Sequence, residues 1–370
     1  MEESKNFLLS LVRMALWKNQ EHLPEFMPDW NKVISLAKKQ TLVGLVADVV
    51  PLLPEHLQPD QNTKVKLHVT AFRIMSSHSL LNRKLVEVKE RMDANGIHTV
   101  LFKGQGVALN YPNPLSRQCG DIDLYVGEEN FMKVMKILAP TSEKDADYYK
   151  YLKHFNVDED GVHIEIHRIA EILPGFRQDR LFQKWTVESL VKGTVREVEI
   201  GGGKINLPSA DFDAIYIMNH AWHHFINGGI GLRQLCDWTM HMHRFHKELD
   251  EKKLRENLKA FGLVEAWKVI AGVAVKYLGL PEEECLLFDR TYLGKSDKML
   301  QVIWEEGNFG HHSTWSRMKR PEGHFAGKFH SFRKGTTRKM KIMSVSPAYV
   351  VQAWIYFFVN GMRHAFIRIG

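Results

Sequence analysis

The stretch that decides the fold is residues 97–126, IHTVLFKGQGVALNYPNPLSRQCGDIDLYV. Its apolar run at 97–102 predicts a strand, which a glycine-containing turn joins to a short helix. A loop then leads to a second strand that begins with Asp121 and Asp123. Residues two apart in a strand point to the same face, roughly 7 Å apart along the backbone. The chain therefore presents two carboxylates side by side at a strand end.

Two neighbouring carboxylates are a costly arrangement because like charges repel each other. A divalent metal ion removes that cost, and Mg²⁺ in particular is held by one or two carboxylates together with substrate phosphates. The spacing of Asp121 and Asp123 therefore indicates a divalent-metal site at the start of the second strand.

Other residues accompany the two aspartates in a fixed order, namely Lys103-Gly104, Tyr111-Pro112, Arg117 and Gly120-Asp121-Ile122-Asp123-Leu124. This pattern resembles the nucleotidyltransferases of the polymerase-beta superfamily. More narrowly, it is similar to a poorly characterised bacterial nucleotidyltransferase-like family with the signature KG…YP…R..GDIDLLV. One departure is Gln105, which follows Gly104 where the superfamily often has a second glycine or a serine.

The resemblance implies an α+β fold, in which a small mixed-sheet nucleotidyltransferase core is flanked by helical regions. It also implies that the turn opens a helix facing the phosphates of a nucleotide, with Lys103, Gly104 and Arg117 as nucleotide-binding residues. Two alternatives stay open. In the first, Lys103 is a plain residue at the end of a strand. In the second, Arg117 is a structural partner that neutralises Asp121.

In the superfamily, a third carboxylate comes from a later strand. Residues 151–157 and 162–167 read as two strands joined by a hairpin. Alternation in the second of them puts His163, Glu165 and His167 on one face and three apolar residues on the other. Glu165 is the acid in the middle of this strand, and we expect it to be the third carboxylate. The alternative is an exposed strand face on which the charge is merely solvated.

The function that the resemblance implies is transfer of a nucleoside monophosphate from an NTP to a hydroxyl acceptor. Two metal ions, Mg²⁺ or Mn²⁺, would be held by Asp121, Asp123 and Glu165, which are also the expected catalytic residues. The acceptor would be a small molecule, a protein hydroxyl or a tRNA end. The competing hypothesis is a catalytically silent nucleotide-binding or scaffold protein of the same fold.

Two helices are predicted after residue 208, and the narrower family has a similar pair after its catalytic domain. Arg233 and Asp237 lie four apart on the second helix. They would form an ion pair, or Arg233 would hold the nucleotide from across a cleft. His220 and His223 are spaced three apart on the first helix, but no third metal ligand accompanies them.

The remaining sequence is organised as helical regions around the core. Apolar residues recur at spacings of three and four before residue 95, and a long helix is predicted from Lys64 to Ala94. Residues 168–208 contain a hairpin with three glycines and are interpreted as a connector. We expect three regions: an N-terminal helical region at 1–95, the core at 96–208 and a C-terminal helical region at 209–370.

The composition is typical of a soluble globular protein, with 44% apolar and 25% charged residues among 370. Cys119, Cys236 and Cys285 lie far apart, which argues against a disulfide framework and favours a reducing compartment. Acidic residues precede the first apolar run, unlike a signal peptide, so we expect a cytoplasmic location. The excess of 50 basic over 43 acidic residues permits an anionic substrate.

The C-terminal quarter has two further features. Residues 311–341 carry nine Lys or Arg residues and one acid, so this segment is either a solvated surface or a binding site for an anionic partner such as RNA or lipid. Residues 342–362 carry no charge. With Pro347 as a helix start, the apolar helix 347–362 is short for a membrane span, so we expect burial against the protein or, second, an interfacial helix.

Overall fold

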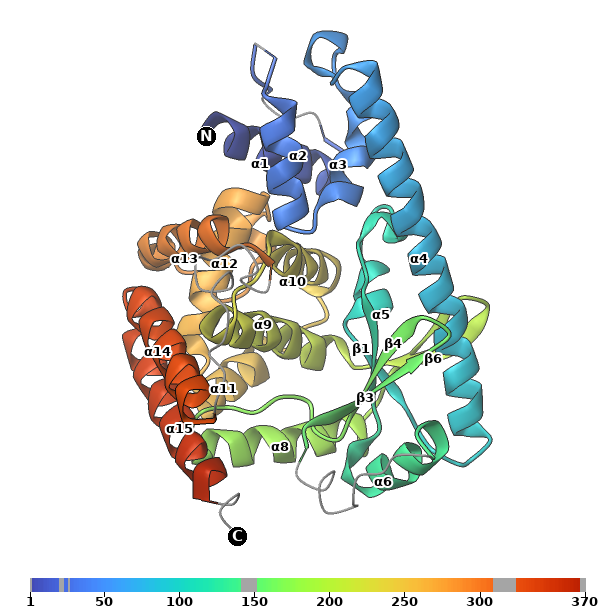
Figure 1. The fold of residues 1–370 in the computed structure, drawn as a ribbon, viewed down its shortest axis with the longest axis vertical. Coiled ribbons are helices and arrows are strands. Elements are labelled where there is room, and N and C mark those ends of the chain that lie inside the picture. Colours follow the sequence, from blue (N-terminus) through green and yellow to red (C-terminus); the bar gives the residue numbers. More distant parts are fainter. Residues whose placement is uncertain (1, 20–22, 26, 141–151, 309–323, 367–370) are drawn as a thin grey trace. The chain divides into compact units, whose positions relative to one another are not determined.

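The computed structural model describes residues 2–19, 23–25, 27–140, 152–308 and 324–366 (Figure 1). The chain divides into two compact units. Unit 1 comprises residues 1–38, 42–172 and 183–216, and unit 2 comprises residues 39–41, 173–182 and 217–370. All strands in the described part of the chain belong to unit 1, so the α+β fold expected from the sequence is confirmed. The division into regions 1–95, 96–208 and 209–370 stays a prediction.

Unit 1 begins with helices. These are α1 (Glu2–Trp17), α2 (Trp30–Lys39), α3 (Val43–Val49) and the 33-residue α4 (Gln61–Asp93), with 3-10 turns η1 (Val50–Leu52) and η2 (Glu55–Leu57) between α3 and α4. Asp60 caps α4 by accepting a hydrogen bond from the backbone N–H of Thr63, an interaction worth about 1 kcal/mol. The predicted long helix is therefore confirmed, three residues longer at its start.

The sheet of unit 1 has four strands in the order β1-β2-β4-β3. Its strands are β1 (Val100–Phe102), β2 (Asp121–Tyr125), β3 (His154–Glu159) and β4 (Val162–His167). Between β1 and β2 lie α5 (Gly104–Ala108) and η3 (Pro114–Ser116), and α6 (Gly127–Leu138) follows β2. β2 runs parallel to β4, whereas the other two pairs are antiparallel. The predicted strand–turn–helix–strand unit and the later hairpin are both confirmed.

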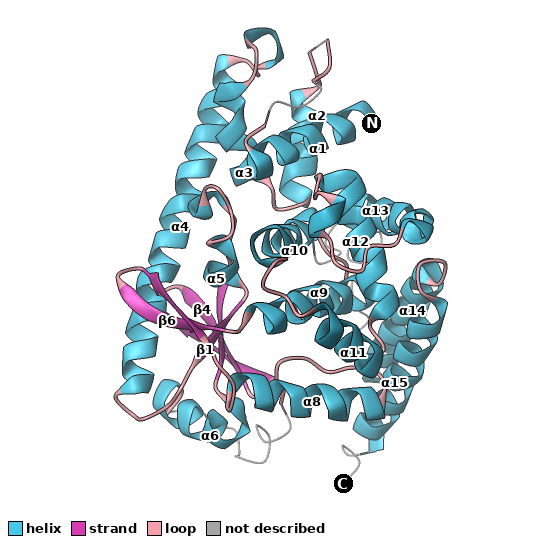
Figure 2. Cartoon of the chain, turned by 180° about the vertical axis from the view of Figure 1, so that it is seen from behind, coloured by secondary structure: helices cyan, strands magenta, loops and turns pink. Residues whose placement is uncertain are grey.

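One face of this sheet is apolar and packs on helices. Ile122 and Leu124 of β2 and Ile164 and Ile166 of β4 are almost completely buried. Their core also contains residues of α4 and α6, namely Leu81, Leu85, Val88, Met92, Phe131, Val134 and Met135. Figure 2 shows these two helices beside the strands. Because side chains alternate along a strand, the intervening residues of β2 and β4 point to the opposite face.

Ion pairs tie α4 to the hairpin between β3 and β4. The buried ammonium group of Lys84 lies 2.6 Å from Asp160, and Arg91 donates to both carboxylate oxygens of Glu159. The pairing lowers the pKa of the Glu159 carboxyl, through the Arg91 hydrogen bond above all, and keeps it ionised at neutral pH. The position of β4 is therefore fixed from both the apolar core and its turn.

The segment 168–208, interpreted as a connector, is more structured than the sequence suggests. It contains α8 (Phe176–Leu190), which runs from unit 2 into unit 1, and the hairpin of β5 (Arg196–Ile200) with β6 (Gly203–Leu207). The hairpin was predicted, but α8 was missed. Its buried positions include Phe182, Thr186 and Leu190, and this sparse spacing of four with a polar member is a weak helix signal.

Unit 2 contains the larger part of α9 (Ala210–Asn227) and four further helices before residue 309. These are α10 (Leu232–Phe245), α11 (Glu251–Phe261), α12 (Val264–Leu278) and α13 (Leu293–Glu306), with η4 (Glu282–Glu284) and η5 (Arg290–Tyr292) preceding α13. The rings of Trp238 and Trp267 meet edge to face at a centroid distance of 4.9 Å and join α10 to α12. The two helices predicted after residue 208 are confirmed as α9 and α10.

The basic segment 311–341 is only partly described, since residues 309–323 lie outside the described chain. In α14 (His324–Ile342), the Arg338 guanidinium donates to the backbone oxygens of Phe225 and Ile226 and pairs with Glu306. Lys339 is buried, and burial lowers the pKa of its ammonium group. A fully solvated basic face is therefore wrong for these two cations, because Lys339 is buried and Arg338 is bound by an acid and by backbone carbonyl groups of neighbouring helices.

The last helix, α15 (Pro347–Phe366), starts at the predicted proline. Tyr349, Val350 and Ala353 are buried, as expected for packing on the protein. The opposite face is exposed and carries Val351, Trp354, Ile355 and Phe358. The expected burial is therefore confirmed for one face. None of the described helices has the length and apolarity that crossing a membrane requires.

Two helix glycines of unit 2 provide a test of packing. A Cβ on Gly272 of α12 would lie about 2.2 Å from the Ser296 hydroxyl oxygen of α13, whereas nothing lies within 4 Å of a Cβ on Gly294. We expect Gly272→Ala to lower the melting temperature by several degrees, corresponding to about 1–3 kcal/mol of overpacking. Gly294→Ala, the matched control, should leave it unchanged or raise it, since alanine is the better helix former. Thermal unfolding followed by circular dichroism measures both. Equal shifts in the two variants would contradict the close approach of α12 and α13.

Candidate functional site

The site begins at a strained turn between β1 and α5. Lys103 has φ +48° and ψ −136°, and Gly104 follows with φ +44°. A non-glycine residue in such a region costs about 1–3 kcal/mol and persists only where its surroundings enforce it. Val107 donates to the Lys103 carbonyl oxygen and so starts α5, and a Cβ on Gly104 would contact the backbone oxygen of Asp121 at 3.7 Å. The turn thus places α5 directly against the start of β2.

Three carboxylates meet beside this turn. In the parallel pairing of β2 with β4, Asp123 lies opposite Glu165, while Asp121 lies opposite His163. One oxygen from each of Asp121, Asp123 and Glu165 lies within 4.8 Å of the other two. Asp123 is buried and the other two are half-buried. The structure therefore brings together the three acids that the sequence singled out, on the face of the sheet opposite the apolar core.

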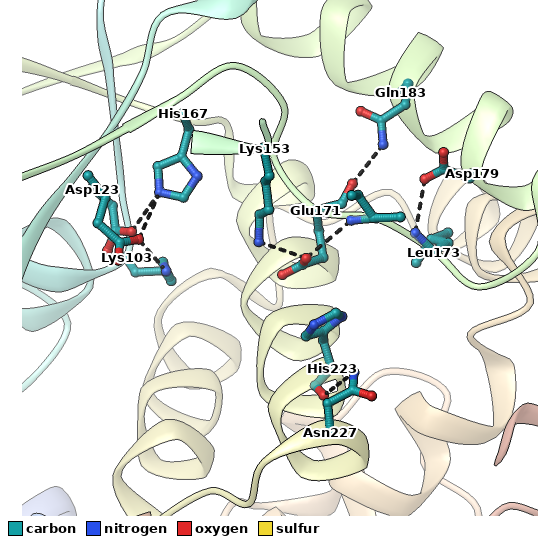
Figure 3. Close-up of polar contacts among 12 residues, drawn as sticks. Lys103, Asp123, Lys153, His167, Glu171, Leu173, Asp179, Gln183, His223 and Asn227 are labelled. Carbon is teal, nitrogen blue, oxygen red and sulfur yellow. Dashed lines mark hydrogen bonds and ion pairs between the residues drawn. The ribbon is translucent and has the colours of Figure 1, made fainter. Parts of the chain in front are cut away.

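Positive and hydrogen-bonding groups offset part of this negative charge (Figure 3). The Lys103 Nζ lies 3.1 Å from Asp123 Oδ1, and His167 Nε2 lies 2.8 Å from the same oxygen. Burial opposes the charge on Lys103, but Asp123, Asp121 and Glu165 together raise the pKa of its ammonium group. Lys103 therefore acts as a countercharge to the three acids and is more than a plain residue at the end of a strand.

The charge state of Glu165 follows from opposing effects. Burial acts to raise the pKa of its carboxyl, whereas a hydrogen bond from His167 and the nearby rings of His154 and His167 lower it, and the net direction is downward. Glu165 is consequently ionised at neutral pH. The alternative, an exposed strand face on which this charge is merely solvated, does not fit the structure. Glu165 is half-buried, and ring nitrogens of His163 and His167 lie 3.9 Å and 3.5 Å from its carboxylate.

Two histidines that the sequence did not single out as functional also belong to this face. His154 on β3 lies opposite His167 on β4, and their ring centroids are 5.2 Å apart. With Glu165 they form a second group whose potential ligand atoms all lie within 4.8 Å of one another. His167 was visible in the strand alternation, but His154 could be found only once the pairing register was known.

Arg117 lies just after η3 and is buried. Its Nη1 donates to the Gln118 carbonyl oxygen at 3.3 Å and to Cys119 Sγ at 3.0 Å. Its own carbonyl oxygen contacts the ring of His78 on α4, and burial together with the Arg117 charge lowers the pKa of His78 to about 4. These contacts anchor the loop before β2 on α4. A role for Arg117 at a nucleotide stays a prediction.

Gln105 follows Gly104 at the start of α5. Its side-chain nitrogen donates to the Asp121 carbonyl oxygen at 3.4 Å, and its side-chain oxygen is buried with no hydrogen-bond partner in the described chain. Gln105 therefore connects α5 to the first aspartate of β2.

Arg233 and Asp237 lie on α10 in unit 2, where Arg233 is half-buried and Asp237 is buried. The two roles considered for Arg233 both stay predictions. His220 and His223 are on α9, and neither belongs to a potential metal-binding group among the described residues.

The model of a protein family described as an uncharacterised nucleotidyltransferase matches residues 27–279. The match spans more than half of the chain. The chain belongs to this family. As a member of the uncharacterised nucleotidyltransferase family, it contains within the matched range all the described strands, the three carboxylates and Arg233. Helices α14 and α15 and the basic segment 311–341 lie outside that range.

No curated protein matches the chain. Among solved structures, it is similar to an antigenic nucleotidyltransferase-like protein from Paracoccidioides brasiliensis, with 14% sequence identity and a TM-score of 0.29. The alignment covers 52% of this chain and 91% of that chain. A likeness at this level carries no weight for the function.

The role of Lys103 as a countercharge can be tested through stability. Because Lys103 has a raised pKa, its stabilising charge is fully present at neutral pH and is lost only as the pH rises through that pKa. We expect Lys103→Met to lose about 1.5–3 kcal/mol of unfolding free energy at pH 7. The deficit should shrink below about pH 4, where carboxyl groups gain protons, and on addition of Mn²⁺.

Denaturant unfolding at pH 7 and at pH 4, with and without Mn²⁺, measures these effects. Lys204→Met is the control, because Lys204 pairs with Glu197 on an exposed hairpin and its removal should cost well under 1 kcal/mol. A Lys103→Met protein as stable as the unmodified chain at pH 7 would contradict the countercharge role.

Proposed function

We propose that the protein is a metal-dependent nucleotidyltransferase, which moves a nucleoside monophosphate from an NTP to a hydroxyl acceptor. The observation that carries the proposal is the meeting of Asp121, Asp123 and Glu165 within 4.8 Å beside the strained turn at Lys103 and Gly104. Membership of the uncharacterised nucleotidyltransferase family supports it.

The residues of the site suit a divalent cation. Three ionisable carboxylates offer oxygen ligands of the kind that Mg²⁺ and Mn²⁺ take, and their mutual repulsion is what a cation would relieve. Asp121, Asp123 and Glu165 would hold the metal. Two such ions, when bound, supply stabilisation of the attacking and leaving oxygens in an in-line displacement at the α-phosphorus.

In the proposed reaction, the acceptor oxygen forms a bond to the α-phosphorus while the bond to the pyrophosphate oxygen breaks. The acceptor hydroxyl loses its proton, and Glu165, whose lowered carboxyl pKa keeps it ionised at neutral pH, would accept that proton. Lys103 carries a positive charge beside the carboxylates and would neutralise phosphate oxygens or the departing pyrophosphate. Gly104 has a positive φ, which glycine adopts readily because it has no Cβ. The absence of a side chain would also let the backbone of the turn approach the nucleotide closely.

Two further cations extend the proposal. Arg117 would contribute through the loop that it anchors, and Arg233 is the second candidate for binding the nucleotide. The acceptor is a small molecule, a protein hydroxyl or a tRNA end, and an anionic acceptor could use the basic segment 311–341.

The first test is ligand-dependent thermal stability with each of the four NTPs, with and without Mg²⁺ or Mn²⁺. A nucleotide at 100 times its dissociation constant adds about 2.7 kcal/mol of stability. We expect a metal-dependent rise with at least one NTP, and pyrophosphate release from that NTP once an acceptor is supplied. Binding without any turnover across the three acceptor classes would favour the catalytically silent alternative, and no binding of any NTP would refute the proposal.

The residue assignment has a separate test. Asp121→Asn should reduce pyrophosphate release at least about a hundredfold, because Asp121 is one of the three carboxylates expected to hold the metal. Glu165→Gln should act in the same direction. Asp93→Asn on the exposed end of α4 is the control and should retain full activity. Unchanged activity in Asp121→Asn, with circular dichroism as for the unmodified chain, would refute the metal assignment.

A further inference from the structure

The face of the sheet that carries the three carboxylates continues into a group of different chemistry. His154, Glu165 and His167 each offer one ligand atom, and these atoms lie within 4.8 Å of one another. The group arises from strand pairing, since His154 of β3 is the register partner of His167, and Glu165 lies two residues before His167 on the same face of β4. It therefore rests on well-ordered strands and not on a loop.

His167 has the hydrogen-bonding pattern of a metal ligand. Its Nε2 lies 2.8 Å from Asp123 Oδ1 and donates a hydrogen bond to that carboxylate, which leaves Nδ1 as the ring atom for a metal ion. That Nδ1 is buried and has no hydrogen-bond partner in the described chain, although the whole residue is only 1% exposed. A buried polar atom without a hydrogen-bond partner destabilises the folded chain unless a ligand pairs with it. Metal-binding histidines commonly donate their other ring N–H to a carboxylate in just this way.

His154 has the complementary properties. Its Nδ1 is also buried without a hydrogen-bond partner among the described residues. An imidazole nitrogen that lacks a hydrogen-bond partner can bind a metal ion instead. Two imidazoles and one carboxylate thus lie together, and each ring has a buried nitrogen that lacks a hydrogen-bond partner among the described residues.

We propose that His154, Glu165 and His167 form a second metal position that selects a first-row transition-metal dication such as Zn²⁺ over Mg²⁺. Imidazole nitrogens suit transition metals, whereas Mg²⁺ takes oxygen ligands. The position shares Glu165 with the oxygen-only group of Asp121 and Asp123, so the two positions are chemically distinct but adjacent. The inference deepens the proposed metal site, but it does not depend on nucleotidyl transfer.

The test is metal binding to the full chain, stripped of metal by a chelator, in the absence of nucleotide. Co²⁺ is the probe, because its visible absorption reports nitrogen ligands, and Zn²⁺ and Mg²⁺ are then added as competitors. We expect one Co²⁺ to bind with a visible spectrum, Zn²⁺ to displace it and millimolar Mg²⁺ to leave it bound. Displacement by Mg²⁺ and Zn²⁺ alike would overturn the proposed selectivity.

Variants distinguish the two positions. His154→Ala should weaken Co²⁺ and Zn²⁺ binding at least about tenfold, and His154→Gln serves the same purpose if the smaller side chain impairs folding. Asp121→Asn belongs to the oxygen-only group, so it should leave Co²⁺ binding within a few-fold. His98→Ala, which removes an exposed histidine, is the matched control. Equal Co²⁺ affinity in the unmodified chain and both His154 variants would refute the second position.

The outcome also separates this inference from the proposed function. Loss of Co²⁺ binding in the His154 variants, in a protein that turns over no NTP, would support the second metal position and refute nucleotidyl transfer. Metal-dependent turnover with unchanged metal affinity in the His154 variants would support nucleotidyl transfer and refute the second metal position. His167 would then be a positioning residue for Asp123.

Discussion

The parallel pairing of β2 with β4 is the constraint on which the site depends. Asp123 lies opposite Glu165 in that register, and the alternation of both strands sends their apolar residues to one face and their acids to the other. A shift of one residue would bury the acids against α4 and α6 and expose the core. The burial of Ile122, Leu124, Ile164 and Ile166 therefore secures the position of the carboxylates.

Charge balance is the second constraint. Three carboxylates within 4.8 Å, one of them buried, need compensation, and Lys103 and His167 both direct a nitrogen at Asp123 Oδ1. The Lys103 backbone adopts a strained conformation while its side chain makes this contact. Strain of this kind is characteristic of functional sites, where a rigid surrounding holds a residue in place. The surrounding here is the core of unit 1 and the ion pairs that fix the β3–β4 turn to α4.

The two groups of potential ligands on this face differ in chemistry because they come from different strand pairs. β2 with β4 gathers oxygen ligands, whereas β3 with β4 gathers imidazoles, and Glu165 belongs to both. In unit 1, cationic and hydrogen-bonding groups compensate acids. In unit 2, oxygen atoms compensate a cation, since Arg338 is bound by Glu306 and by backbone carbonyl oxygens of α9. The basic character of the C-terminal segment in the sequence therefore overstates the charge that its described part offers to a partner.

The sequence by itself indicated the turn at Lys103 and Gly104 and the paired acids Asp121 and Asp123, because strand alternation and the spacing of a motif are local properties. The α+β class and the choice of Glu165 as a third acid came from the resemblance that this motif carries. The sequence missed α8, whose few buried positions give little periodicity, and it could not place His154 in the site. Strand register and the pairing of distant charges are tertiary properties. Only the fold could therefore bring His154 beside His167, turn Arg338 inward, and set Lys103 against Asp123, since each contact joins residues that no local pattern connects.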